Sequence, residues 1–282
     1  MKKVTLLVLV VAMSLFAGAR TGAGGSGPSG PYRGTITLEE MFPVGLTGSY
    51  GLSIQDNVTN SIWISNWGDL INIEFDMTTG SQTGTTWDIT NGIDPDDSGY
   101  DIYGGSGQWF FGDWTFSNIG VFEEDGTYLK SIAGPAGDWS TVTGVAPASD
   151  HGMLYISDFN TADNEIAWGT YTGTESSVTW TTAPYGPVSG MSVWGDYLFI
   201  CCQLAGEDNI FIHEINPDGS PNTTPVWSAE FVLEDMTGAG GIDYDGTYLW
   251  LYPQNTSLYK LSIDFDPGAL ENATWGQIKA SL

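Results

Sequence analysis

Residues 61–67 read Ser-Ile-Trp-Ile-Ser-Asn-Trp, and this stretch recurs in altered form four more times along the chain. The later copies are Gln-Trp-Phe-Phe-Gly-Asp-Trp at 108–114, Met-Leu-Tyr-Ile-Ser-Asp-Phe at 153–159, Tyr-Leu-Phe-Ile-Cys-Cys-Gln at 197–203 and Tyr-Leu-Trp-Leu-Tyr-Pro-Gln at 248–254. The third residue of every copy is aromatic: Trp63, Phe110, Tyr155, Phe199 and Trp250. By subtraction of their numbers, these aromatic residues are 47, 45, 44 and 51 positions apart. β-rich units with such a period are typical of a propeller array.

A second repeat has the same count. A small hydroxyl residue followed by glycine opens each unit: Thr47-Gly48, Ser98-Gly99, Thr143-Gly144, Ser189-Gly190 and Thr237-Gly238. Glycine has no Cβ and therefore permits close approach of backbones, as the innermost strands of a ring require. The two repeats together predict an all-β, five-bladed β-propeller over residues 34–265, folded as one domain.

The units span residues 47–90, 98–134, 143–183, 189–234 and 237 onward. The last unit contains three strand-like segments instead of four. Residues 34–42 alternate like a strand that belongs to no unit. We therefore expect this N-terminal strand to complete the last blade and close the ring, which removes an open sheet edge.

The two ends of the chain differ from the repeats. Lys2 and Lys3 precede an apolar run at 4–16 and the triplet Ala17-Gly18-Ala19, which is the pattern of a secretory signal over residues 1–19. Residues 20–33 resemble a flexible Gly/Ser/Pro leader, and residues 266–282 a tail with a short helix. No later segment is apolar for long enough to cross a membrane. We expect a secreted, periplasmic or cell-surface protein without membrane insertion after signal cleavage.

The charge is strongly negative. The chain has 34 acidic and 7 basic residues, and from residue 21 onward four cations remain, so that 4 − 34 = −30. Nucleic acid and anionic lipid gain affinity through Lys and Arg, so neither is an expected partner. Two explanations of the acidity stay open: adaptation to salt, and binding of Ca²⁺. The two cysteines, Cys201 and Cys202, are neighbours on an expected strand and are expected to be buried small residues without a disulfide.

The blade layout resembles that of secreted bacterial five-bladed β-propellers, comparable to NHL-like and other sensor propellers. The resemblance covers residues 34–265. The Trp-Asp and Gly-His pairs of WD40 blades and the double glycines of Kelch blades do not occur at the corresponding places. The resemblance therefore implies a fold and carries no functional residues.

Candidate ligand-binding residues follow the second strand of three units. Propeller ligands usually bind at the channel mouth, on the face that carries the loops between second and third strands. Carboxylates or amides next to aromatic residues in these loops suggest binding of a sugar or a cation. The alternative is that each Asp or Asn caps its own loop. The candidates are Asn66, Trp67, Asp69, Asp113, Trp114, Asp158 and Asn160, and Trp139 is a further tryptophan in an expected loop.

Acidic residues also cluster in two expected loops. Asp94, Asp96 and Asp97 lie between the first two units, and Asp163 lies close to Asp158 and Asn160. Asp94, Asp96, Asp97 and Asp163 are candidate Ca²⁺ ligands, although the spacing departs from that of an EF-hand loop. A solvated acidic loop is the competing interpretation.

Function is less constrained than fold. His151 and His213 show no metal-ligand spacing, and no nucleophile elbow or phosphate loop occurs. The preferred hypothesis is a non-enzymatic extracellular binding module for Ca²⁺, carbohydrate or a protein partner. One alternative is a glycoside-acting enzyme with two carboxylates at the channel mouth, for which Asp101 and the loop acids are candidates. The other is a structural component of an extracellular assembly.

Overall fold

The computed structural model describes residues 32–55, 58–159, 165–203, 208–231, 240–254 and 257–265. Residues 266–282, for which the sequence predicts a short helix, lie outside these ranges, as do residues 1–31 with the predicted signal. Among the described residues the single helical segment is a 3-10 turn, η1 (Ser149–His151). No helix among them is long and apolar enough to span a membrane.

The strands have the following bounds in chain order: β1 (Tyr32–Arg33), β2 (Ile36–Pro43), β3 (Ser49–Ile54), β4 (Ser61–Asn66), β5 (Ile71–Asp76), β6 (Gln82–Asp88), β7 (Pro95–Tyr103), β8 (Ser106–Asp113), β9 (Asn118–Glu123), β10 (Tyr128–Ala133), β11 (Gly144–Ala148), β12 (Met153–Ser157), β13 (Glu165–Thr170), β14 (Thr181–Pro184), β15 (Val188–Trp194), β16 (Tyr197–Cys202), β17 (Ile210–Glu214), β18 (Trp227–Ala229), β19 (Gly241–Tyr244), β20 (Leu249–Tyr252) and β21 (Ser257–Ile263).

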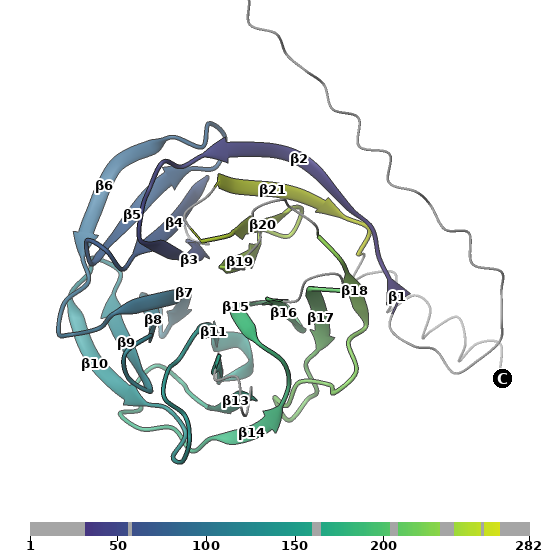
Figure 1. The fold of residues 1–282 in the computed structure, drawn as a ribbon. Helices are drawn as coiled ribbons and strands as arrows, with labels where there is room; N and C mark the ends of the chain where they lie inside the picture. The colour runs from purple at the N-terminus through teal and green to yellow at the C-terminus, as the bar shows by residue number, and fades with distance from the viewer. Residues whose placement is uncertain are drawn as a thin grey trace, which may run out of the picture. The chain divides into compact units, whose positions relative to one another are not determined.

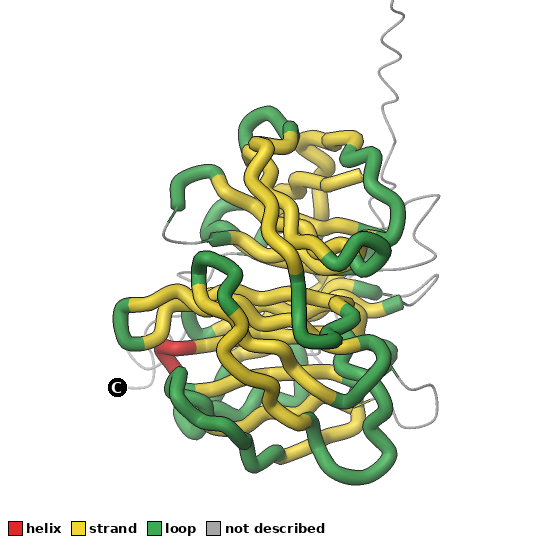
Figure 2. The backbone as a smooth tube through the Cα atoms, turned by 90° about the vertical axis from the view of Figure 1, so that its left-hand side faces the viewer, coloured by secondary structure: helices red, strands yellow, loops and turns green. Residues whose placement is uncertain are grey.

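These strands form five sheets arranged in a ring (Figure 1). The sheets are β3-β4-β5-β6, β7-β8-β9-β10, β11-β12-β13-β14, β15-β16-β17-β18 and β19-β20-β21-β2, which we call blades one to five. Seen from the side, strands make up the body of the ring, and many of the connecting loops lie at its two faces (Figure 2). The predicted five-bladed β-propeller is confirmed.

Blade five contains both ends of the folded chain. β2 pairs antiparallel with β21, with Leu38 opposite Leu261 and Phe42 opposite Leu258. The first strand after residue 33 thus supplies the fourth strand that the last unit lacks. The structure adds one feature: Tyr32 and Arg33, which by sequence belong to the leader, form β1 and pair in parallel with β18 at the outer edge of blade four.

The core is divided among the interfaces between blades. Five clusters of buried apolar side chains each join residues of two neighbouring blades. The aromatic third residue of every repeat belongs to one of these clusters: Trp63, Phe110, Tyr155, Phe199 and Trp250. Phe199 of blade four, for example, stacks on Tyr244 of blade five with 4.9 Å between the ring centroids. The repeat is therefore a core-packing signal, because each aromatic side chain fills the space between two sheets.

The innermost strands approach one another too closely for side chains at some positions. A Cβ on Gly190 would lie 2.4 Å from the carbonyl oxygen of Gly240, and one on Gly241 would lie 2.1 Å from the backbone nitrogen of Leu52. The predicted role of glycine is therefore observed in Gly190. In blade five the close approach falls on Gly241, whereas the predicted Gly238 lies outside the described residues.

His213 is a buried titratable group on β17. Its Nδ1 lies 2.7 Å from the carbonyl oxygen of Asn222, to which it donates, and its Nε2 is left to accept from the Tyr185 hydroxyl. Burial lowers the pKa of His213 to about 4, from an ordinary value of 6.5. The folded protein thus favours the neutral ring, and the unfolded chain binds more protons between these two values.

We therefore expect the free energy of unfolding to fall by roughly 2 kcal/mol between pH 7 and pH 5 through this one residue. Urea unfolding at several pH values measures it. A His213→Gln variant, which does not titrate there, is expected to be less stable at pH 7 and to show a smaller decline over the same interval. An equal decline in both proteins would contradict the assignment.

Candidate functional site

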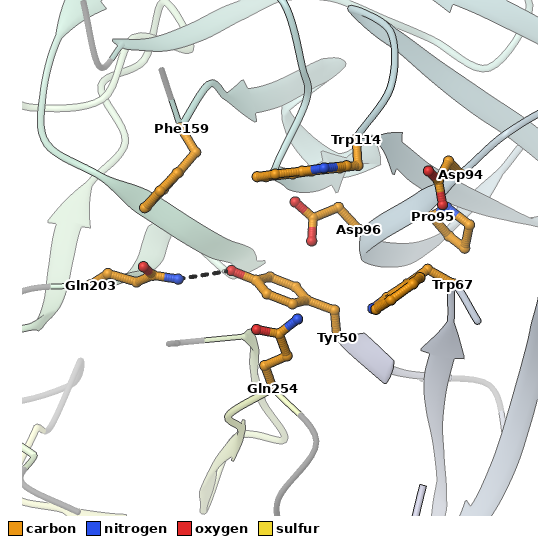
Figure 3. Close-up of a pocket in the computed structure, with 9 residues that line it drawn as sticks. All are labelled: Tyr50, Trp67, Asp94, Pro95, Asp96, Trp114, Phe159, Gln203 and Gln254. Atoms are coloured by element: carbon orange, nitrogen blue, oxygen red, sulfur yellow. Dashed lines mark hydrogen bonds between the residues drawn. The ribbon is translucent and has the colours of Figure 1, made fainter. Parts of the chain in front are cut away.

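A pocket of about 390 Å³ lies at the channel mouth. We call its side of the ring the upper face, which carries the loops between second and third strands. The last residue of every copy of the seven-residue repeat lines this pocket, one from each blade: Trp67, Trp114, Phe159, Gln203 and Gln254. Figure 3 shows these side chains around a common centre. The repeat therefore builds both the core, with its third residue, and the pocket, with its seventh.

In blades one and two, the polar residue at the end of the second strand fixes the loop that follows. Asn66 Oδ1 accepts from the backbone N–H of Asp69 at 3.0 Å. Asp113 Oδ1 accepts from the N–H groups of Thr115 and Phe116 at 2.8 and 3.1 Å. Such loop caps hold the chain that presents Trp67 and Trp114.

The five seventh positions divide the pocket into two halves. Blades one to three contribute rings, and blades four and five contribute the amides of Gln203 and Gln254. Trp67 and Trp114 are 45% and 50% exposed, unusually high fractions for tryptophan. Within the described ranges, no ring-to-ring contact engages Trp67, Trp114 or Phe159, unlike most of the buried aromatic side chains. Their faces are therefore available to a ligand.

Tyr50 and Asp96 lie deeper in the pocket (Figure 3). The Tyr50 hydroxyl accepts from Gln203 Nε2 at 3.2 Å. Burial, and then the nearby Asp96, raise the pKa of Tyr50 well above its usual value of 10, so that its hydroxyl stays protonated. Asp96 is 4% exposed, and its Oδ2 is buried without a hydrogen-bond partner among the described residues. Burial, and then Asp97 and Asp94, raise the pKa of Asp96 well above its usual value of 3.8.

Asp97, the neighbour of Asp96 on β7, links the innermost strands of three blades. Its Oδ2 accepts from the backbone N–H groups of Val145 on β11 and Met191 on β15, at 3.2 and 3.0 Å. One carboxyl group of blade two thus bonds to the innermost strands of blades three and four. Next to it, a cavity among the innermost strands measures only about 20 Å³, too small for a ligand.

The described lining of the pocket contains no basic residue, whereas two of its members are the acids Asp94 and Asp96. An anionic ligand would meet these carboxyl groups and the chain's formal charge of −27 without a compensating cation. The arrangement suits a neutral or positively charged ligand with an apolar face and some hydrogen-bonding groups.

The sequence-predicted ligand residues lie in different environments. Trp67 and Trp114 line the pocket. Asn66 and Asp113 are buried caps of their own loops, and Asp158 is buried and accepts from Thr141 Oγ1 at 2.8 Å. Asp69 is exposed beside Trp67 without lining the pocket, and Asn160 lies outside the described residues.

Trp139 was predicted to be available to a ligand, and this is wrong. It is 9% exposed, and its Nε1 donates to Glu165 Oε2 at 2.8 Å. Its indole completes the core between blades two and three, in the same cluster as Val142.

The predicted acidic loop before blade two is a strand. Pro95, Asp96 and Asp97 belong to β7 and are buried, so the expectation of a solvated loop is wrong. Asp97 tolerates this position because backbone N–H groups bond to its Oδ2. Of the predicted Ca²⁺ ligands, Asp163 lies outside the described residues, and Asp94 accepts from Thr115 Oγ1 at 2.8 Å. No group of three or more His, Cys, Asp or Glu suited to a metal ion occurs in the described part of the chain.

Five lining residues are not among the sequence-predicted candidates: Phe159, Gln203, Gln254, Tyr50 and Pro95. Phe159, Gln203 and Gln254 occupy the same repeat position as Trp67 and Trp114, so alignment of the five copies on their seventh residue would have identified them. Tyr50, the fourth, carried no comparable signal, because its place depends on a register shift between β3 and β4.

Comparisons with known proteins agree with the fold. The chain is similar to a glutaminyl cyclase from Myxococcus xanthus (TM-score 0.58, 11% identity, 84% of this chain and 100% of that chain). It is similar to a PQQ-bound aldose sugar dehydrogenase from Streptomyces coelicolor (TM-score 0.50, 11% identity, 84% and 100%) and to a chain of a nidogen/laminin complex (TM-score 0.50, 17% identity, 77% and 85%). No family model and no curated protein matches. At these identities the similarity shows the propeller fold alone, and it is shared by enzymes and by a protein of a binding complex.

Proposed function

We propose that this protein is a non-enzymatic extracellular binding module that takes a small organic ligand into the pocket at the upper face. One observation carries the proposal: the same repeat position on all five blades lines one pocket, with rings on one side and amides on the other. A volume of about 390 Å³ falls within the range of small-molecule sites. The secretory pattern of residues 1–19 supports an extracellular location.

Carbohydrate and organic cations remain as ligand classes. Both use aromatic faces, and both can bond to carboxyl and amide oxygens. Ca²⁺ has less support, because Asp97 is bonded to backbone N–H groups and the described lining of the pocket holds no carboxylates beyond Asp94 and Asp96.

The two tryptophans give the direct test. We expect Trp114→Ala to weaken ligand binding about tenfold, since a lost stacking ring costs on the order of 1–2 kcal/mol. Isothermal titration with a panel of mono- and oligosaccharides and small ammonium compounds measures the affinity. Trp194→Ala is the matched control, because Trp194 is 37% exposed and lines cavities other than this pocket. Equal losses in both variants, or no binding by any panel member, would overturn the proposal.

A glycoside-acting enzyme is the second candidate, because Asp94 and Asp96 both line the pocket. Glycosidases place two carboxyl groups on either side of the scissile bond. Here both come from the start of blade two, and Asp101 accepts from Ser149 Oγ at 2.8 Å outside this pocket. A hydrolysis screen decides the matter: turnover of any glycan that disappears in Asp96→Asn would show an enzyme.

A further inference from the structure

The buried carboxyl group of Asp96 has an oxygen without a partner. Buried carboxyl oxygens in folded proteins almost always have a hydrogen-bond partner, because a buried oxygen without a hydrogen bond lowers the stability of the fold. Asp96 Oδ2 is buried and has none among the described residues, and the carboxyl group points into the space between Trp114 and Tyr50 (Figure 3). When Asp96 is ionised, the group that satisfies this oxygen is either a hydrogen-bond donor or a positive charge.

The rings around Asp96 favour a compact positive group. Trp67, Trp114 and Phe159 come from three consecutive blades, and blades of a five-bladed ring are about 72° apart around the axis. Figure 3 shows the three rings edge-on around the pocket, so that their faces look inward at different angles. A sugar ring stacks the C–H groups of one or both of its faces on aromatic rings. A roughly spherical ammonium group contacts several faces at once, and each face is the negative side of a ring quadrupole.

The acidic residues near the pocket also favour a cationic ligand. Asp94 adds a second carboxyl group to the lining, and none of the described lining residues is basic. With 34 acidic and 7 basic residues, the chain attracts cations to its surface before they reach the pocket. On the opposite wall, Gln203 and Gln254 supply amide groups that suit the polar remainder of a small organic molecule.

We propose that the pocket binds a small organic cation, with an alkylated ammonium group held between Asp96 and the faces of Trp67, Trp114 and Phe159, and its polar remainder toward Gln203 and Gln254. This inference rests on the proposed binding function and names the ligand class. The ring faces supply cation–π attraction, and Asp96 supplies the counter-charge.

The decisive comparison uses two probes of nearly equal shape. Choline carries a trimethylammonium group, and 3,3-dimethylbutan-1-ol carries the same branched group without charge. We expect choline to bind the wild-type protein at least about tenfold more tightly, measured by isothermal titration. Equal affinities would overturn the inference, whatever the behaviour of any variant.

Two variants test whether Asp96 is the counter-charge of the bound cation. We expect Asp96→Asn to weaken choline binding about tenfold or more and to change binding of the neutral alcohol little. Asp69→Asn is the matched control, because it removes one exposed charge from the same face without touching the pocket, and choline affinity should stay nearly constant. A parallel loss in both variants would mean that overall charge, and not Asp96, attracts the cation. Near-UV circular dichroism checks that each variant is folded.

The pH dependence provides an independent readout. Without a bound cation, burial and then the neighbouring Asp97 and Asp94 raise the pKa of Asp96 and so favour its neutral form, and Tyr50 beside it stays protonated. A bound cation stabilises the ionised form, so binding releases a proton and choline affinity should rise from pH 5 toward pH 8. The rise should vanish in Asp96→Asn.

The outcomes separate the inference from the function on which it rests. If neutral saccharides bind in a Trp114-dependent manner while choline does not, the ligand class is wrong and the binding function stands. If neither choline nor any saccharide of the panel binds, both fail.

Discussion

A chain that begins at residue 44 is expected not to yield a folded monomer. It lacks β2, which pairs with β21 from Ile36 to Pro43 and completes blade five. It also lacks Phe42, which is 6% exposed and stacks on Trp250 with ring centroids 6.1 Å apart. Phe42 belongs to the cluster that joins blade five to blade one, so its loss opens both a sheet edge and the seam of the ring.

Size-exclusion chromatography and thermal unfolding measure this effect. We expect aggregation or loss of a cooperative transition, because an unpaired β21 edge can pair with another molecule. A chain that begins at residue 32 retains β1 and β2 and serves as the control. A milder test is Phe42→Ala, for which we expect a loss of about 3–4 kcal/mol in the free energy of unfolding. A monomeric, cooperatively melting chain from residue 44 would show that closure does not hold the ring together.

Replacement of Asp97 by alanine is expected to cost roughly 4 kcal/mol of stability. The carboxyl group is fully buried, and its removal leaves the N–H groups of Val145 and Met191 without partners between three blades. Each unsatisfied buried donor costs about 1–3 kcal/mol, and the vacated volume adds to the loss.

Chemical denaturation gives the measurement, and Asp125→Ala gives the comparison within the same blade. Asp125 is exposed and accepts from the N–H of Thr127 at 2.9 Å in a surface turn, so its loss should cost about 1 kcal/mol or less. Asp97→Asn, which keeps one acceptor oxygen, should fall between the two. If Asp97→Ala and Asp125→Ala lowered the free energy of unfolding by similar amounts, the hydrogen bonds of Asp97 would not hold the blades together.

The wrong predictions share a physical cause. Aspartate at 96 and 97 beside Pro95 predicts an exposed turn, because isolated carboxylates avoid burial. Backbone N–H groups from β11 and β15 reverse this preference for Asp97, and they come from residues 48 and 94 positions away. Trp139 similarly lies in a loop by local pattern and is buried by contact with Glu165 of blade three.

The number of blades, their order and the closing strand follow from the sequence alone, because the aromatic third residue of each repeat must fill the space between neighbouring sheets and therefore returns at a nearly constant interval. The seventh residues of the same repeats, including Gln203 and Gln254, form the ring of side chains that lines the pocket. The residues at the centre of that ring of side chains could be identified only from the tertiary structure. Tyr50 and Asp96 reach the pocket from strands with register shifts, and Asp97 bonds to strands far apart from it in sequence. A periodic sequence specifies what is repeated, whereas the chemistry of this pocket depends on residues at which the repeat is broken.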